Sequence, residues 1–313
     1  MLRVVVRGLI GAVPVLLLVS LITFALMRFI PGDPSAAIAG ISATPQQIEA
    51  IRRDLGLDQP LLTQLLRWYA GMLHGDLGRS ILLGRDVVGA TLERLPVTLA
   101  LSAYALVLTL VFGLAFGIVA ALRQNSWVDQ AAMMLSMLGI SVPNFFLGLM
   151  MIILFSVQLG WLPTGGYVAF TQNPWEWFRT STMPAVSLAL LQMGLLARIT
   201  RSTMLEVLRQ DYVRTARAKG LNERTVVLKH ALRNALTPII TLGALELGTL
   251  LSGAVLTEQV FTIPGFGKLI VDSVFNRDYA VVQGVVLVTA SAYMLLNLLA
   301  DLAQFAVNPR LRR

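Results

Sequence analysis

Long apolar stretches recur along this chain and constrain its fold more than any other feature. Helices that cross a bilayer need about 20 predominantly apolar residues, and a helix satisfies all of its backbone hydrogen bonds within lipid. We therefore expect an all-α membrane protein. Six transmembrane helices are predicted, over residues 9–27, 96–122, 131–159, 183–197, 239–257 and 281–307.

The composition supports a lipid environment and excludes several classes of function. Hydrophobic residues make up 56% and charged residues 13% of the chain, with a mean hydropathy of +0.72. Although the net charge is +8, the basic residues lie between apolar spans, which argues against nucleic-acid binding. Cysteine is absent, and His74 and His230 are the only imidazoles. We therefore expect no catalytic residue, no metal site and no cofactor in this chain.

The amino terminus resembles a signal peptide at first sight, because Arg3 and Arg7 precede an apolar run. That run, residues 9–27, is longer than the usual signal-peptide core of about 7 to 15 residues. We interpret it as a retained first span.

The distribution of charge predicts the orientation of the helices. If the amino end is cytoplasmic, the inner segments hold 15 Lys and Arg and 4 Asp and Glu. The outer segments hold 10 Lys and Arg and 11 Asp and Glu. Basic residues favour the cytoplasmic side of a membrane. Both termini are therefore expected in the cytoplasm.

The chain is expected to divide into a first span (residues 1–30), an extracytoplasmic cap (31–95) and a five-helix core (96–313). In the cap, Thr44 and Gln47 form a capping-box pattern ahead of a short helix that Gly56 would end. A second apolar helix face follows it, which could pack on the bundle or lie on the membrane surface; we favour packing. Pro143 is expected to bend the third span.

Between the fourth and fifth spans lies a basic segment, residues 198–238, too long for a simple turn. Asp211 is a candidate N-cap for a short helix over residues 212–219, which Gly220 would end. Asn222 is a candidate N-cap for a second helix, and Pro238 suits the first turn of the fifth span. The pattern predicts a short helix held between two longer ones.

Two interpretations of this segment are open from the pattern alone. A basic loop can bind anionic lipid headgroups, at about 1 kcal/mol for each Lys or Arg near the surface. The succession of caps and stops is more than such a loop requires, and it favours a docking element for a cytoplasmic partner.

Two motifs here, DYVRTARAKG (residues 211–220) and KHALRNAL (229–236), resemble the coupling region of ABC-importer permeases. The similarity is to the dipeptide and oligopeptide permeases, with their nickel and glutathione relatives. The general importer motif begins Glu-Ala-Ala, whereas Arg214-Thr215-Ala216 stands here, so the role of that Glu is not transferred. Further matching motifs are PGDP (31–34), LGLDQP (55–60), GDLGRS (75–80), PGFG (264–267), RDY (277–279), VVQG (281–284) and NPRLR (308–312).

The resemblance implies a type I importer fold and a permease subunit that moves dipeptides or oligopeptides across the bacterial cytoplasmic membrane. Its implied partners are a second homologous permease, two cytoplasmic ATPase domains and an extracytoplasmic solute-binding protein. ATP and Mg would belong to the ATPases, since this chain lacks a GxxxxGK[ST] loop. The implied coupling helix, which docks on the ATPase, comprises Asp211, Tyr212, Val213, Arg214, Thr215, Ala216, Arg217, Ala218, Lys219, Gly220 and Leu221.

Three polar residues within the spans are candidates for the translocation path or for a helix interface: Glu246, Asn297 and Asp301. Charged groups at membrane depth almost always face the protein interior. Glu246 would contact either the solute or a neighbouring helix, and we favour the interface.

Other functions fit the sequence less well. A membrane enzyme would need a nucleophile beside its base, and both histidines lie outside the spans. A stand-alone secondary transporter with a lipid-binding loop is the main rival. Nickel, glutathione or another small solute is the alternative cargo.

Overall fold

The computed structural model describes residues 2–29, 33–40, 42–80 and 82–307. Within the PGDP motif, residues 31 and 32 lie outside this range, as do the NPRLR motif and the predicted cytoplasmic carboxyl end. The described chain is mostly helical and forms two compact units. We call them the bundle unit (Met1–Val4, Leu99–Ile263 and Leu296–Arg313) and the cap unit (Val5–Thr98 and Pro264–Leu295).

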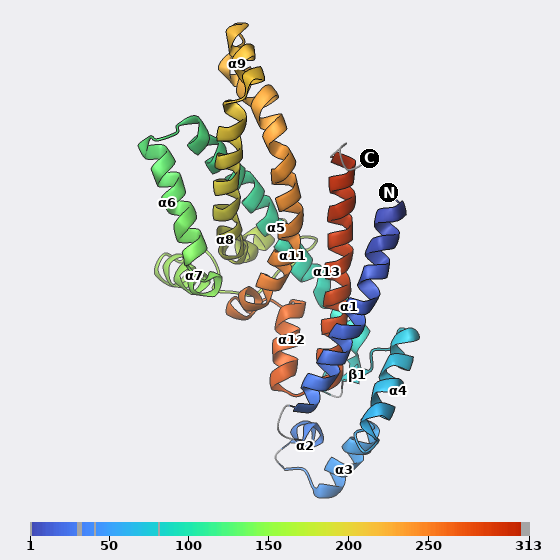
Figure 1. The fold of residues 1–313 in the computed structure, drawn as a ribbon. Coiled ribbons are helices and arrows are strands. Elements are labelled where there is room, and N and C mark those ends of the chain that lie inside the picture. Colours follow the sequence, from blue (N-terminus) through green and yellow to red (C-terminus); the bar gives the residue numbers. More distant parts are fainter. Residues whose placement is uncertain (1, 30–32, 41, 81, 308–313) are drawn as a thin grey trace. The chain divides into compact units, whose positions relative to one another are not determined.

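The elements follow one another along the chain as Figure 1 shows. The first part contains α1 (Leu2–Phe29), α2 (Pro34–Ala39), α3 (Pro45–Asp54), α4 (Leu61–Leu73), β1 (Arg79–Ser80), β2 (Arg85–Asp86) and α5 (Val87–Leu122). The middle contains α6 (Trp127–Ser141), α7 (Asn144–Met151), the π-helical η1 (Ile152–Gln158), α8 (Pro174–Leu208), α9 (Asp211–Ala218), α10 (Glu223–Thr225) and the π-helical η2 (Val226–Leu232). The last part contains α11 (Arg233–Val260), α12 (Phe266–Phe275) and α13 (Tyr279–Val307).

Apolar helix length in the described chain supports several membrane spans. Four helical stretches are long and apolar enough to cross a membrane: Gly8–Leu26, Val87–Leu122, Pro174–Leu208 and Tyr279–Leu299. A fifth span results if the bent pair Trp127–Ser141 and Asn144–Gln158 counts as one. The chain is thus a multi-pass helical membrane protein. The expected fourth stretch of 15 residues is part of a longer helix, α8, of 35 residues.

The predicted bend at Pro143 is confirmed and is much sharper than a kink. The axes of the two helices that flank it differ by 104°. Proline cannot donate a backbone hydrogen bond, so α6 ends at Ser141 and α7 starts after Pro143. The single span expected over residues 131–159 is therefore a pair of helices.

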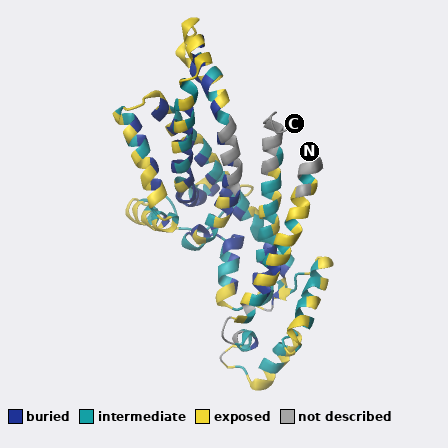
Figure 2. Ribbon diagram, viewed as in Figure 1, coloured by how far each residue is buried: buried dark blue, intermediate teal, exposed yellow. Residues whose placement is uncertain are grey.

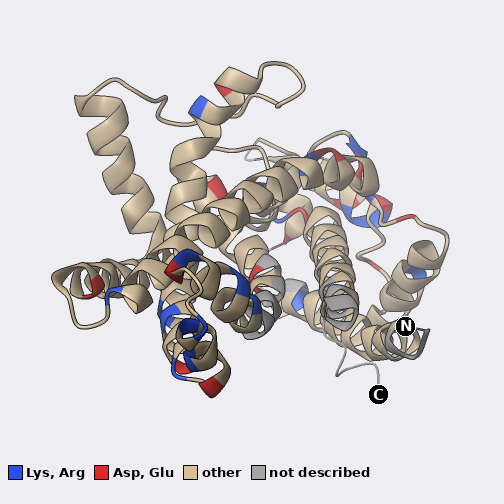
Figure 3. Ribbon diagram, turned by 90° about the horizontal axis from the view of Figure 1, so that it is seen from above, with Lys and Arg blue, Asp and Glu red and all other residues tan. Residues whose placement is uncertain are grey.

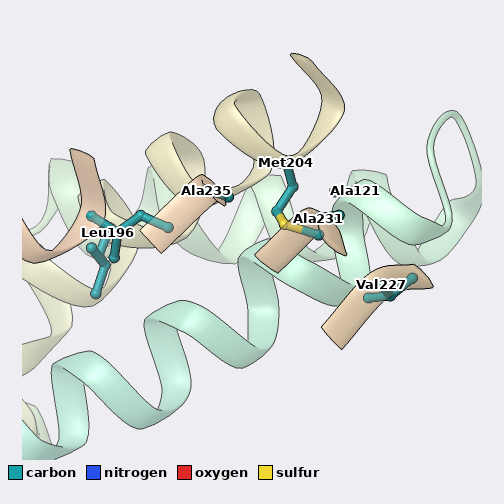
Figure 4. Close-up of a cluster of buried hydrophobic side chains, with 7 residues drawn as sticks. Ala121, Leu196, Met204, Val227, Ala231 and Ala235 are labelled. Atoms are coloured by element: carbon teal, nitrogen blue, oxygen red, sulfur yellow. The ribbon is translucent and has the colours of Figure 1, made fainter. Parts of the chain in front are cut away.

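The core of the bundle unit forms where α8 meets its neighbours. Apolar side chains from four helical elements pack together (Figure 4): Ala121, Leu196, Met204, Val227, Ala231, Ala235 and Ile239. Alanines on η2 and α11 have little side-chain volume, which lets these helices approach α8 closely. The short helix α9 projects from the helices that this cluster packs together.

Glycines set the spacing between α8 and its neighbours. A Cβ atom on Gly194 of α8 would lie 2.5 Å from the backbone oxygen of Ser136 on α6. On α5, a Cβ atom at Gly117 would lie 2.5 Å from Cβ of Thr200. Small residues of this kind allow close packing of helix backbones in membranes.

We predict that Gly194→Ala lowers the stability of the chain by about 1–3 kcal/mol, because the added methyl group forces α6 away from α8. The measurement is the thermal unfolding midpoint of the purified protein in detergent. Gly11→Ala is the matched control, since a Cβ atom there meets nothing within 4 Å and alanine favours a helix. Equal midpoints for the two variants would contradict the role given to Gly194.

In the cap unit, the short helices follow the local signals of the sequence. Thr44 caps α3, and Gln47 accepts the Thr44 backbone N–H at 2.8 Å, which completes the predicted capping box. The helix ends at Asp54, and Gly56 follows with a positive φ of 64°. β1 and β2 form an antiparallel pair with Arg79 opposite Asp86.

The predicted apolar face of α4 is packed at some positions and exposed at others. Tyr69 shares a hydrogen bond of 2.8 Å with Ser20 of α1, and Trp68 stacks on Phe24 with centroids 6.2 Å apart. Leu62 and Leu66, in contrast, are 67% and 59% exposed. Part of the predicted apolar face of α4 is therefore open in this chain, and α4 carries both exposed and intermediate positions in Figure 2.

Candidate functional site

The short helix predicted between the fourth and fifth spans is present as α9, Asp211–Ala218, between the end of α8 and α10. It differs from the prediction at its start. Gln210 occupies the N-cap position and makes no side-chain cap hydrogen bond, while Asp211 is the first helical residue. The helix therefore begins one residue earlier than expected, and Asp211 acts on it through its negative charge in the first turn.

One apolar face fixes α9 to the adjoining helices. Val213 and Ala216 are buried and pack with Val226 of η2 and Leu208 of α8. Their spacing of three residues places both on one side of the helix. This side chain pair anchors α9 within the bundle unit.

Polar contacts hold the same helix at two further points. Asn234 of α11 donates a hydrogen bond of 3.0 Å to the Tyr212 hydroxyl. Arg217 donates through Nε and Nη2 to Glu223 of α10, at 3.1 and 2.6 Å. A fork of two parallel bonds fixes orientation as well as distance. α9 is thus held by α8, α10, η2 and α11 together.

The outward face of α9 is left open. The side chains of Asp211 and Arg214 are 96% and 76% exposed, and Thr215, Ala218 and Lys219 are exposed as well. Leu221 adds an apolar side chain that is 41% exposed. Basic residues gather at this end of the bundle unit (Figure 3). A rigid helix with an exposed mixed face can dock on a partner.

The turn after α9 depends on Gly220, whose φ is +74°. Its N–H bonds to the oxygen of Arg217 at 2.9 Å, and the Leu221 N–H bonds to the oxygen of Ala216. This is the usual glycine ending of a helix. Asn222 then caps α10 by accepting from the Thr225 N–H at 3.3 Å, as predicted.

The helix after this turn runs on into the expected fifth span. α10, η2 and α11 follow one another without a break from Glu223 to Val260. Pro238 therefore lies inside α11 and not in the first turn of a new helix, contrary to the prediction. Motion of α9 would pass directly into α8 on one side and α11 on the other.

We expect the Arg217–Glu223 pair to loosen in acid. The Arg217 guanidinium beside Glu223 holds the pKa of that carboxyl below its ordinary value. Because the pKa is lowered in the folded chain, the pair stabilises the fold above the ordinary glutamate pKa of about 4.3 and stops doing so as the pH falls through the lowered value. The effect is small for an exposed pair, at most about 1 kcal/mol.

A spin label on Ala218→Cys would report this loosening as increased mobility between pH 7 and pH 3, because the chain has no other cysteine. The Glu223→Gln variant should show the same mobility at every pH. A pH response that persists in Glu223→Gln would contradict the assignment.

A second polar group lies inside the bundle unit around Glu246, which is only 7% exposed. The Thr249 hydroxyl lies 2.8 Å from the backbone oxygen and 3.0 Å from a carboxylate oxygen of Glu246. Gln192 of α8 donates to that hydroxyl at 2.6 Å. This network joins α8 to α11.

The other two polar candidates of the apolar spans, Asn297 and Asp301, lie on α13. Asn297 is half-buried on α13, and none of the contacts described for Glu246 involves it. Asp301 lies on α13 as well, but its side chain is outside the described part of the structure.

An ion pair that the sequence did not reveal ties α6 to α8. Arg201 donates from Nε and Nη2 to the two carboxylate oxygens of Asp129, at 2.5 and 2.6 Å. Asp129 is 3% exposed and also accepts the Asn125 N–H at 2.9 Å. The two residues are 72 positions apart, so no local pattern could have paired them.

Family comparisons identify the class of protein to which this arrangement belongs. Residues 113–313 match the family described as binding-protein-dependent transport system inner membrane component, and residues 1–102 match its amino-terminal companion. The chain belongs to this family. The permease therefore has the membrane location and transport role that the family name states, and the expected family resemblance is confirmed.

Individual relatives match over nearly their whole length. A protein of Brucella abortus (strain 2308), named as a peptide transport system permease protein, is 47% identical over 301 residues, 96% of each chain. The glutathione transport system permease protein GsiC of Escherichia coli (strain K12) is 42% identical over 312 residues, 100% of this permease and 99% of the relative.

A solved structure of lower sequence similarity shares the fold. It is the MetNI methionine ABC transporter in an inward-facing conformation, with a TM-score of 0.60 and 18% identity. The alignment covers 71% of this permease and 97% of that chain. The importer permease fold predicted from the sequence is confirmed at this level.

Proposed function

We propose that this permease carries short peptides into the cell as one of two homologous membrane subunits of an ATP-driven importer. It works with two cytoplasmic ATPase domains, which bind ATP and Mg, and with an extracytoplasmic solute-binding protein. In this proposal the permease spans the bacterial cytoplasmic membrane six times, with both ends in the cytoplasm. α9 is the coupling helix that docks on an ATPase.

The observation that carries the proposal is the way α9 is mounted. Its buried face is fixed to Leu208 and Val226, which belong to the helices on either side. Its outer face, with Asp211 and Arg214, is free of such contacts and strongly exposed. A partner that moves α9 therefore also moves α8 and α11. Coupling follows if the two nucleotide states of the ATPase favour different arrangements of these helices.

Crosslinking would test the docking step, because the chain has no cysteine. A photoreactive group on Ala218→Cys should react with the ATPase subunit in the purified complex. Gln124→Cys, exposed in the loop between α5 and α6, is the matched control and should react much less. Equal reaction at both positions would contradict docking through α9.

Uptake into vesicles would test the energy source and the cargo. Vesicles that hold the complete complex should accumulate a labelled dipeptide only when Mg and ATP reach the ATPase side and the binding protein is on the other. Accumulation by the permease alone would show a secondary transporter and overturn the proposal.

Glutathione is the second candidate cargo, favoured by the 42% identity to GsiC. Competition in the same vesicles separates the two: unlabelled glutathione should displace the dipeptide only if both use this machine. Preferential uptake of glutathione over dipeptides would assign the second cargo.

A further inference from the structure

The cap unit contains a half-open cavity of about 360 Å³. Three aromatic side chains contribute to its wall, Phe24, Trp68 and Tyr279. They come from α1, α4 and α13, so the cavity forms only where these three helices pack together. Its volume lies within the range of small-molecule sites, about 300 to 1,000 Å³.

Unpaired hydrogen-bond donors gather in this wall. Buried Nε and Nη1 of Arg28, Nε1 of Trp68 and Nε2 of Gln283 have no hydrogen-bond partner among the described residues. Gln283 is only 6% exposed. Guanidinium and indole nitrogens donate and never accept, and a buried donor without a partner costs about 1–3 kcal/mol. The missing partner is therefore a hydrogen-bond acceptor.

Arg28 also has no carboxylate partner among the described residues. Its Nη2 donates to the neutral Gln64, and its guanidinium lies 4.7 Å from the centre of the Phe24 ring and 5.5 Å from that of Tyr279. No ion pair with a carboxylate is found for Arg28 within the described parts of the chain. A cation removed from water in this way is stabilised most by an anion.

Two of the three aspartates in the wall bond to other groups, and no described ion pair joins Arg28 to any of the three. Asp278 accepts from the Ser80 hydroxyl and from the Val281 N–H, and Asp76 accepts from the Gly78 N–H at 2.8 Å. Five arginines and three aspartates line the cavity in total. The excess of positive charge persists after these aspartates are counted.

We propose that this cavity binds the carboxylate group of a small solute of about dipeptide size. Arg28 supplies the charge, Trp68 and Gln283 supply neutral donors, and the aromatic rings contact the apolar part of the solute. Arg28, whose buried Nε and Nη1 lack a partner among the described residues, matches with the two neutral donors the single charge of a carboxylate better than the greater charge of a phosphate. The proposal stands on the cap unit alone and does not depend on the proposed transport function.

Calorimetry on the purified full-length permease in lipid nanodiscs would test the proposal with three probes. Alanyl-alanine should bind, and alanyl-alanine amide, which lacks the carboxylate, should bind at least about tenfold more weakly, the effect expected for a lost bond to a charged group. Inorganic phosphate should bind no better than the amide. Equal binding of peptide and amide, no binding of the peptide, or preferential binding of phosphate would each overturn the proposal.

Substitutions of residues in the cavity wall test whether the peptide binds in the cavity or elsewhere in the permease. Arg28→Gln should weaken alanyl-alanine binding at least about tenfold, and Trp68→Phe should weaken it severalfold while it keeps the ring contact with Phe24. Arg53→Gln is the matched control, since Arg53 lines the same cavity with a side chain that is 70% exposed, and it should bind as the parent does.

Unchanged binding in Trp68→Phe would exclude the cavity even if Arg28→Gln failed to fold. Weakening by Arg53→Gln as large as that by Trp68→Phe would also overturn the proposal, because a general charge effect would then explain the data.

Discussion

Gly220→Val is expected to abolish most transport while the assembled complex continues to hydrolyse ATP. Gly220 has a φ of +74°, a conformation that costs a residue with a Cβ atom about 1–2 kcal/mol, and more for a β-branched one. Such a cost lowers the population of the docking geometry about five- to thirtyfold. The measurement is dipeptide uptake per ATP hydrolysed in vesicles.

The surroundings of Gly220 show whether backbone strain or a collision of the side chain would cause the loss of transport. A Cβ atom there would meet nothing within 4 Å, so a substitution strains the backbone and does not collide with a neighbour. Gly220→Asn is the matched control, because asparagine tolerates a positive φ, and it should retain most of the coupling. If asparagine and valine uncoupled equally, the side chain and not the turn would be responsible; if both transported normally, α9 would not be the coupling helix.

The short helix α9 could be predicted from the sequence because its signals are local. The cap at Asn222 and the stop at Gly220 each act within one or two turns of helix. Such patterns also predicted the capping box at Thr44. Even there the first helical residue was misplaced, since Asp211 competes with Gln210 for the cap position and only the path of the chain decides between them.

The remainder of the site depends on contacts between distant segments. Gln192 and Thr249 are 57 residues apart, and nothing near either residue in the sequence marks it as a partner of the other. The same holds for the donors around Arg28, whose lack of a partner is a property of packing. Sequence periodicity gives the apolar face of a helix, but it does not give the helix that covers that face. The angle at Pro143 was similarly beyond prediction, because proline fixes the position of a break and the neighbours fix its size.

Arg201→Met is expected to lower the stability of the permease by about 2–4 kcal/mol, the largest change in folding energy that we predict. It leaves the carboxylate of Asp129, 3% exposed, without its cation, and breaking a buried pair in this way is strongly destabilising. We place the value below the full range for buried pairs because the Arg201 side chain is 25% exposed. The measurement is the thermal unfolding midpoint in detergent.

Two further variants separate the charge from the packing. Arg201→Lys keeps a cation but loses the two parallel bonds to the carboxylate, so its effect should be intermediate. The double variant Arg201→Met with Asp129→Ala removes the stranded charge and should recover part of the loss. Glu93→Ala, which breaks an exposed pair with Arg85, should change stability by less than about 1 kcal/mol.

A double variant no more stable than Arg201→Met alone would show that the aliphatic part of Arg201, and not its charge, joins the two helices. That distinction bears on the coupling step. A charge pair with two parallel bonds keeps the start of α6 in one orientation on α8 when α9 moves, whereas apolar contacts would let the two helices slide past each other. The variants of Arg201 and Asp129 should therefore also lower the uptake per ATP hydrolysed, in the same order as they lower stability.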